Sequence, residues 1–344
     1  MSEPFEYFYG NGNIKRQEWH KRDDIDGVFH RENGGPAIID YYPNGNIKSM
    51  ACYVNGRLHG TGNAATFEFS ENGNILLKKW YNNGLLHRED GPAIVQYDDN
   101  GNILLKEWHE NGLLHREDGS AVIQYNDNSN LLLEEWYNNG VLHRENDVAK
   151  IEYDGNGNIL LKEWHNNGML HREDGPARIK YNANGNVLLR EWYRNGMLHR
   201  EDGVARIEYD SNGNILLREW YENGVLHKLD GPAKIEYDAN FNVLIKEWYD
   251  NGVLHKLDGP AIIKYVHFQY YTATELEEWY DNGVLHRLDG PAVIQYYPYR
   301  NKTPYLEEWY ENGVLHRLDG PAVIRYFPRG EIEEETWYIN GELY

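Results

Sequence analysis

The sequence has few of the features on which functional assignments usually depend. Cys52 is its single cysteine, so an internal disulfide is excluded and a reducing compartment suits the chain. The N-terminal residues contain no basic segment followed by an apolar run, and no stretch reaches the ~18 apolar residues of a membrane-spanning helix. We therefore expect an intracellular, cytoplasmic protein.

Basic side chains are scarce relative to acidic ones. The chain has 34 Lys and Arg against 55 Asp and Glu, which gives a net charge of −21. This charge opposes contact with phosphate backbones and anionic membranes, so we expect neither direct nucleic-acid binding nor membrane binding. A basic protein partner is favoured, although the charge could serve solubility alone.

Helical periodicity is also missing. No window places apolar residues three and four apart over a useful length. The chain instead has 28 Tyr, 11 Trp and 34 Gly, a composition typical of strands separated by turns. The aromatic fraction of 14% is too high for a disordered chain.

The tryptophans reveal an internal repeat. They recur every 28 residues at Trp80, Trp108, Trp136, Trp164, Trp192, Trp220 and Trp248. Cys52 lies 28 residues before Trp80 and occupies a vacant Trp position, whereas the spacing after Trp248 changes to 31, 30 and 28. We predict a single continuous array over residues 1–344, with irregular repeats at 1–60, regular repeats at 61–265 and repeats with modified turns at 266–344.

One unit shows how the repeat should fold. Residues 177–181 alternate apolar and basic side chains, which is the pattern of a strand with one buried face. A second strand is predicted at 187–193, and Asn184-Gly185-Asn186 should join the two because both Asn and Gly tolerate a positive φ. A second Asn-Gly, at Asn195-Gly196, should end the second strand. The predicted fold is all-β, an elongated solenoid of stacked antiparallel β-hairpins with about eleven repeats of ~28 residues.

The pattern Tyr-x-x-Asn-Gly…Trp-Tyr-x-Asn-Gly-x-Leu-His resembles the MORN-type repeats, in particular a longer bacterial variant of antitoxin-like proteins. The extended form Leu-His-Arg-Glu-Asp-Gly-Pro-Ala is similar to arrays common in giant DNA viruses, and a viral source would imply the host cytoplasm. The resemblance covers nearly the whole chain and implies a hairpin array used for binding or scaffolding.

A series of histidines invites a metal-binding interpretation, which the spacing argues against. Equivalent positions should lie roughly 9–10 Å apart, the width of two strands. Donors to one zinc ion lie within roughly 4 Å of each other, so neighbouring histidines cannot share an ion. We predict that each imidazole bonds the next turn, and we expect neither a metal nor a cofactor. The series is His30, His59, His87, His115, His143, His171, His199, His227, His255, His286 and His316.

Two other repeated groups also suggest chemistry. The Arg and Glu that follow each histidine could form an ion-pair ladder of weak, exposed pairs. The tryptophans could stack a sugar or a base, but packing between hairpins is the favoured interpretation. Because an enzyme needs one unique constellation and these groups recur in every repeat, we expect no enzymatic activity and no catalytic residues.

Differences between repeats are more informative about specificity. Glutamates at one position give way to leucines in the C-terminal third, which suggests either a contact surface or a deeper groove that buries the leucines. Two turns become aromatic, which suggests either recognition or drift. The candidate partner surface comprises Leu229, Leu257, Leu288, Leu318, Phe268, Tyr270, Tyr271, Tyr297 and Tyr299.

The function expected from these observations is a non-enzymatic protein-interaction scaffold. Two alternatives remain open. One is an inhibitor or antitoxin-like protein that masks a basic surface, whose binding would be lost at high salt. The other is a structural component that self-associates end to end through its terminal hairpins.

Overall fold

A computed structural model describes residues 3–21, 27–31, 33–60, 62–300 and 302–344. Residues 22–26, within the stretch predicted to be irregular, lie outside this set. The chain divides into two compact units, which we call the first unit (1–169 with 183–185) and the second unit (170–182 with 186–344). Within the described residues every regular element is a β-strand, which confirms the all-β prediction.

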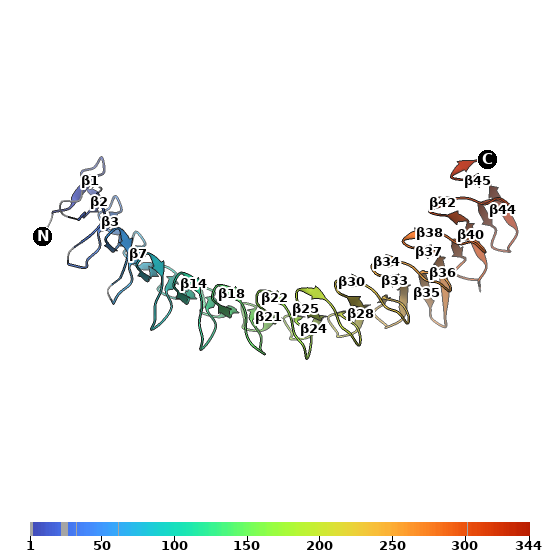
Figure 1. The fold of residues 1–344 in the computed structure, drawn as a ribbon, viewed down its shortest axis with the longest axis horizontal. Coiled ribbons are helices and arrows are strands. Elements are labelled where there is room, and N and C mark those ends of the chain that lie inside the picture. Colours follow the sequence, from blue (N-terminus) through green and yellow to red (C-terminus); the bar gives the residue numbers. More distant parts are fainter. Residues whose placement is uncertain (1–2, 22–26, 32, 61, 301) are drawn as a thin grey trace. The chain divides into compact units, whose positions relative to one another are not determined.

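Each repeat after the first contains two long strands and two short ones, and the first repeat contributes only two long strands to the described residues (Figure 1). The long strands of the first unit are β1 (Phe5–Phe8), β2 (Ile14–Glu18), β3 (Ile38–Tyr41), β4 (Ile47–Ala51), β7 (Thr66–Phe69), β8 (Ile75–Lys79), β11 (Ile94–Tyr97), β12 (Ile103–Glu107), β15 (Val122–Tyr125), β16 (Leu131–Glu135), β19 (Lys150–Tyr153) and β20 (Ile159–Glu163). Those of the second unit are β23 (Arg178–Tyr181), β24 (Val187–Glu191), β27 (Arg206–Tyr209), β28 (Ile215–Glu219), β31 (Lys234–Tyr237), β32 (Val243–Glu247), β35 (Ile262–Phe268), β36 (Tyr271–Glu278), β39 (Val293–Tyr296), β40 (Pro304–Glu308), β43 (Val323–Tyr326) and β44 (Ile332–Thr336).

The short strands form a separate two-stranded hairpin in each repeat after the first. Up to the start of the second unit they are β5 (Tyr53–Val54), β6 (Arg57–Leu58), β9 (Tyr81–Asn82), β10 (Leu85–Leu86), β13 (His109–Glu110), β14 (Leu113–Leu114), β17 (Tyr137–Asn138), β18 (Val141–Leu142), β21 (His165–Asn166) and β22 (Met169–Leu170). In the second unit they are β25 (Tyr193–Arg194), β26 (Met197–Leu198), β29 (Tyr221–Glu222), β30 (Val225–Leu226), β33 (Tyr249–Asp250), β34 (Val253–Leu254), β37 (Tyr280–Asp281), β38 (Val284–Leu285), β41 (Tyr310–Glu311), β42 (Val314–Leu315), β45 (Tyr338–Ile339) and β46 (Glu342–Leu343).

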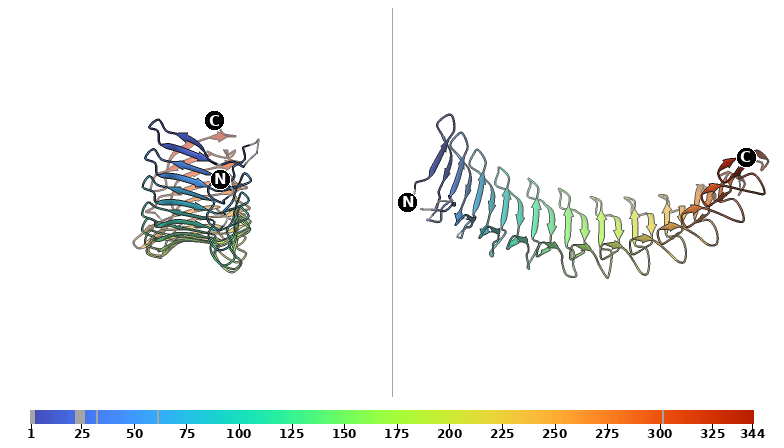
Figure 2. Two further views of the ribbon diagram at one scale, coloured as in Figure 1. Left: turned by 90° about the vertical axis from the view of Figure 1, so that its left-hand side faces the viewer. Right: turned by 45° about the horizontal axis from the view of Figure 1, so that its top comes forward.

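Within each unit the long strands pair antiparallel into a continuous ladder. β31 pairs with β32 in its own hairpin and with β28 of the preceding repeat, and the same arrangement recurs along both units. Figure 2 shows the long hairpins side by side, with the β-turns at one end of the strands and the short hairpins and connecting loops at the other. The prediction of stacked antiparallel hairpins is therefore confirmed.

The second strand of each repeat is shorter than predicted. The strand expected at 187–193 ends at Glu191, and Tyr193 begins the short hairpin β25–β26. Trp192 donates its backbone N–H to the carbonyl of Ala205 in the next repeat and accepts from His199. The chain thus bends at each Trp position, and Cys52 makes the equivalent bonds to Ala65 and His59, which confirms that it occupies a Trp position.

The two Asn-Gly turns of a repeat differ in conformation. At the short hairpin both residues have positive φ, as in Asn223 (48°) and Gly224 (86°), which is the type I′ turn that suits a two-residue loop. At the long hairpin Gly101 has a φ of 86°, but Asn100 is not among the residues with positive φ. A register shift between Gln96 and Tyr97 accompanies this turn, so a bulge replaces the predicted turn in which both residues are positive.

The most deeply buried position is the alanine that precedes each first strand. Ala93, Ala177, Ala233 and their equivalents are completely buried, and no large side chain in the described residues is. The sequence predicts a core of the Ala, Ile and Tyr that alternate in the first strand, the Leu three residues before Trp, the Trp itself and the Leu before His. The alanine is confirmed, and only some of the larger residues are buried. Leu189, Leu276 and Leu306 are buried, whereas Trp337 is 42% exposed. A single layer of hairpins places no side chain far from solvent, so only the small alanine disappears completely.

Candidate partner surface

The tryptophan of each repeat is stacked against a cation from the connecting loop. Arg200 lies 4.3 Å above the Trp192 ring and Lys228 lies 3.9 Å above that of Trp220. Most other repeats of the described chain show the same pairing. This geometry favours a cation–π attraction. It occupies one face of the ring, so the tryptophans act in packing between loop and hairpin.

The histidine series bonds the next repeat, as predicted. The Nδ1 atom of His171 accepts the backbone N–H of Asn195 at 3.2 Å, and His199 accepts that of Asn223 at the same distance. Every histidine of the series makes the equivalent bond, at 3.0–3.5 Å. Because the Asn that donates this N–H begins a type I′ turn, each imidazole fixes the short hairpin of the following repeat.

The predicted Arg–Glu ladder is replaced by a different ion pair. Arg88 pairs with Asp90 at 2.7 Å, while the Glu89 side chain is 91% exposed. Several other repeats show the same Arg–Asp pair at 2.8–2.9 Å. The arginine side chain must turn inward to reach the Trp ring, so it bonds the Asp two residues on, and the intervening residue points outward.

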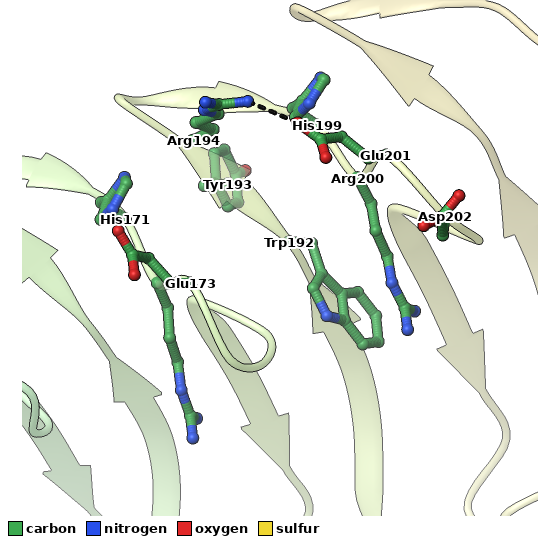
Figure 3. A pocket seen from close by; sticks show the side chains of 10 residues that line it. His171, Glu173, Trp192, Tyr193, Arg194, His199, Arg200, Glu201 and Asp202 are labelled. Atoms are coloured by element: carbon green, nitrogen blue, oxygen red, sulfur yellow. Dashed lines mark hydrogen bonds and ion pairs between the residues drawn. The ribbon is translucent and has the colours of Figure 1, made fainter.

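Shallow grooves lie between successive loops (Figure 3). One has a volume of ≈ 440 Å³. It is lined by His171, Arg172, Glu173, Trp192, Tyr193, Arg194, His199, Arg200, Glu201 and Asp202. In the first unit the equivalent groove, around Trp136, is ≈ 520 Å³. The walls carry charges of both signs, and in the residues described no group of three or more His, Cys, Asp and Glu has an arrangement that could hold a metal ion.

A row of partly buried glutamates runs along the long strands. Glu191 and Glu219 are buried, and each accepts a hydrogen bond from the tyrosine two residues on. Burial and the neighbouring carboxylate raise the pKa of Tyr193 and of Tyr221 to about 12. Arg206 lies between the two carboxylates and makes an ion pair with each. These charges are compensated within the sheet and are unavailable to a ligand.

The four candidate leucines are strongly exposed. Leu229, Leu257, Leu288 and Leu318 are 88%, 88%, 86% and 77% exposed; we call them the leucine row. The alternative in which a deeper groove buries them is therefore wrong. They occupy the position of Glu89 and Glu201, the residue that the inward turn of the preceding cation directs to solvent.

The aromatic turns form a second and separate group. The Phe268 and Tyr271 rings stack at 4.7 Å, and Tyr299 lies 5.4 Å from Phe268. Tyr270 is 88% exposed. Tyr297 differs, because its hydroxyl donates to the carbonyl of Tyr326 at 2.7 Å and is held within the array.

The two groups lie at opposite ends of the long strands. Leu257 precedes β35, and Phe268 ends it. A strand of seven residues extends over roughly 23 Å. One compact partner contact would therefore use the leucine row or the aromatic turns, and only an extended partner would reach both.

Sequence reasoning missed a further exposed row. Val225, Val253, Val284 and Val314 are 40–44% exposed and lie on the short hairpins. They follow the second Asn-Gly of each repeat, where a polar residue would suit an exposed turn. An apolar residue recurs at this position in the sequence, and that recurrence could have revealed the exposed valines.

Comparisons with known proteins give one short family match and slight likenesses to solved structures. A family model described as a MORN repeat variant matches residues 39–55, and no curated protein matches the chain. Among solved structures, the Tc holotoxin pore of Photorhabdus luminescens is 10% identical over 97% of this chain and 17% of that chain, with a TM-score of 0.17. TcdB2-TccC3-Cdc42 is 11% identical over 97% of this chain and 18% of that chain, with a TM-score of 0.13. The chain spans less than a fifth of either solved chain, and likenesses this slight say nothing about function.

Among the residues with a described placement, no helix has the length and apolar character needed to cross a bilayer.

Proposed function

We propose that the chain is a non-enzymatic scaffold that binds a protein partner through the leucine row. The match of a MORN repeat variant model to residues 39–55 supports a repeat-based interaction module. The observation that carries this proposal is the exposure of one leucine in each of four successive repeats. A row of strongly exposed apolar side chains is typical of an interaction site. An intracellular location is part of the proposal and is supported by the free thiol of Cys52.

The earlier repeats show that the fold does not require these leucines. Glu89, Glu117 and Glu173 occupy the same loop position as Leu257, and the loops around them keep the same cation–π and His–Asn contacts. An exposed leucine contributes little to the stability of the chain itself. The leucines are therefore free to serve binding.

The antitoxin-like alternative has its own supporting observation. In the first unit, exposed carboxylates such as Glu89 occupy the loop position in successive repeats, and a regular acidic row could cover a basic surface. Binding of that kind would weaken steeply with salt. Contacts made by leucines would be salt-tolerant, so the two functions differ in a measurable way.

The test compares two matched full-length variants in pull-downs from the cytoplasm of the source cell. Leu257→Glu, Leu288→Glu and Leu318→Glu combined introduce the residue that the earlier repeats already carry. The control combines Glu89→Gln, Glu117→Gln and Glu173→Gln. We expect the leucine variant to lose its bound proteins and the control to keep them at about 0.5 M salt, where exposed charge pairs are screened. Identical bound proteins for wild type and the leucine variant would overturn the proposal.

A further inference from the structure

We propose that the leucine row and the acidic residues beside it form a docking strip for an extended, basic protein segment, with apolar and basic side chains recurring about every third residue. This inference rests on the proposed function and specifies the chemistry of the partner. The strip lies in the second unit, on the short hairpins and the connecting loops.

The position of each leucine is close to that of an acidic residue on the short hairpin. The repeat around Trp192 shows this directly. There Arg194 on β25 pairs with Glu201 in the loop, with 2.8 Å between Nη1 and Oε1 (Figure 3). In the next repeats Glu222 replaces Arg194 and Leu229 replaces Glu201. A carboxylate and a leucine thus occupy two neighbouring positions of the same surface.

The exposed valines share the face of these acidic residues. Glu222 is the cross-strand partner of Val225, and Asp250 that of Val253. Side chains that are directly paired across two strands point to the same side of the hairpin. The same pairing joins Asp281 with Val284 and Glu311 with Val314. Each of the four repeats therefore presents a valine, a carboxylate and a leucine.

All four leucine repeats carry an acidic residue on the short hairpin. Where the loop residue is Glu89, Glu145 or Glu173, the hairpin residue is Asn82, Asn138 or Asn166, whereas the repeat of Glu117 carries Glu110. In all four repeats with a leucine, the hairpin residue is acidic: Glu222, Asp250, Asp281 and Glu311. In the leucine repeats the carboxylate thus lies on the hairpin while the loop position is apolar.

The charge of the strip is not cancelled by the neighbouring cations. Lys228 and Lys256 precede two of the leucines, but their Nζ atoms lie 3.9 Å from the Trp220 and Trp248 ring centroids. Burial there and the nearby Lys246 lower the pKa of Lys256. The side chains of Glu222, Asp250 and Asp281 are 58%, 53% and 52% exposed. One oxygen of Asp250 lies 3.1 Å from His227 Nδ1, and one of Asp281 lies 3.1 Å from His255 Nδ1. A partner therefore meets apolar groups and partly exposed carboxylates.

The negative charge of the strip determines which class of partner could bind to it. A second copy of a chain with a net charge of −21 would place acidic residues against acidic residues, which costs free energy. Nucleic acid and anionic lipid are disfavoured for the same reason. A protein segment that combines apolar side chains with Lys or Arg complements both features of the strip.

The spacing of the repeats indicates which backbone conformation of the partner segment would match the strip. Two strands per repeat separate equivalent side chains by roughly 9–10 Å. A polyproline II helix advances about 3.1 Å per residue and has three residues per turn, so every third side chain recurs on one face after about 9.3 Å. In a β-strand the third residue points to the opposite side. An extended segment with a three-residue period therefore matches successive leucines.

The experiment uses the full-length protein and a labelled synthetic peptide of four Pro-Leu-Lys triplets, with fluorescence anisotropy as the readout. A peptide of the same composition in scrambled order and a Pro-Leu-Glu peptide are the controls. We expect the periodic peptide to bind, the scrambled peptide to bind at least about tenfold more weakly, and the acidic peptide not to bind. Leu257→Glu with Leu288→Glu and Leu318→Glu should weaken binding by about tenfold or more.

A second variant tests the acidic residues. Asp250→Asn, Asp281→Asn and Glu311→Gln combined should weaken binding and flatten its dependence on salt, since charge pairs are screened. Equal binding of the periodic and scrambled peptides, no binding of either, or insensitivity to both variants would overturn the inference. If the periodic peptide fails to bind while the leucine variant still loses its partners in pull-downs, the scaffold function stands and only this partner class is wrong.

Discussion

Single side chains in this protein hold repeats together by using groups that elsewhere perform chemistry. The imidazole of His171 accepts a backbone N–H of the next hairpin, and Arg200 lies over the Trp192 ring. Each contact is weak alone, but the same contact recurs in successive repeats. Because a repeat borders only its neighbours, these contacts supply the interface energy on which the stability of an array depends.

Removal of one histidine should have a measurable cost. His171→Ala leaves the N–H of Asn195 without its acceptor, so we expect a loss of about 1–2 kcal/mol of stability. The matched control is Glu173→Ala in the same loop, whose exposed side chain should change stability by less than about 0.5 kcal/mol. Denaturant unfolding followed by tryptophan fluorescence measures both. Equal midpoints for wild type and His171→Ala would show that the bond is dispensable.

At this scale the sequence predicted the role of the histidines but not that of the arginines. The spacing of His87 and its equivalents excluded a shared metal ion and left a bond to the next turn as the role. The partner of Arg88 could not be foreseen, since Glu89 and Asp90 both follow it. The choice depends on the inward turn of the side chain toward Trp80, which only the folded loop defines.

The hairpin element depends on small residues at two places. Ala233 is completely buried where the chain enters the first strand, and its N–H donates to the carbonyl of Glu247 at 2.8 Å. Asn223 and Gly224 supply the positive φ values of the short turn. Both places lie where backbones approach closely, so the repeat tolerates little variation in size there.

Enlargement of the buried alanine should destabilise the array. Ala233→Leu adds three carbons where no space exists, and overpacking of this kind costs about 1–3 kcal/mol. Ala239 is exposed in the turn of the same repeat, so Ala239→Leu serves as the control and should be nearly neutral. The shift of the denaturant midpoint reports the difference. A neutral Ala233→Leu would mean that the strand entrance can relax.

The sequence predicted the long hairpins and missed the short ones. The alternation in 177–181 identified the first strand, and Asn184-Gly185 identified the turn. The short strands have two residues each, as in Tyr193–Arg194, and a pair of residues shows no periodicity. Their hydrogen bonds become visible only once the chain bends at Trp192.

At the scale of the whole molecule, titration should couple many repeats at once. Burial and a carboxylate partner raise the pKa of Tyr193, Tyr221, Tyr280 and Tyr310 to about 12. A raised pKa means that the folded chain holds the phenolic proton more tightly than the unfolded chain does. The stabilisation is therefore complete below the ordinary pKa of about 10 and is lost as the pH rises toward about 12.

The expected result is a fall in the unfolding midpoint between about pH 10 and pH 12. Tyr221→Phe and Tyr310→Phe combined remove two of the titrating hydroxyls and should make the fall less steep. Comparison with wild type cancels the titration of lysines. A slope unchanged by these substitutions would indicate that the tyrosines titrate alike in the folded and unfolded chains.

The regular contacts stay nearly constant along the chain, whereas the proposed binding surface varies between repeats. The buried alanines and the His–Asn bonds recur with little change, whereas the loop residue changes from Glu89 to Leu229 between early and late repeats. The substitution was visible in the sequence, but the exposure of Leu229 was not. It depends on Lys228 turning inward onto Trp220. The proposed contact surface thus uses positions that the fold leaves unconstrained.

Site-specific photocrosslinking tests this claim most directly. A photoreactive residue replaces Leu288 in one full-length variant and Glu117, the equivalent loop position of the first unit, in another. If the leucine row contacts a protein partner, irradiation in cells gives a discrete adduct from position 288 and none of that mass from position 117. The same adduct at both positions, or none at position 288, would contradict the account.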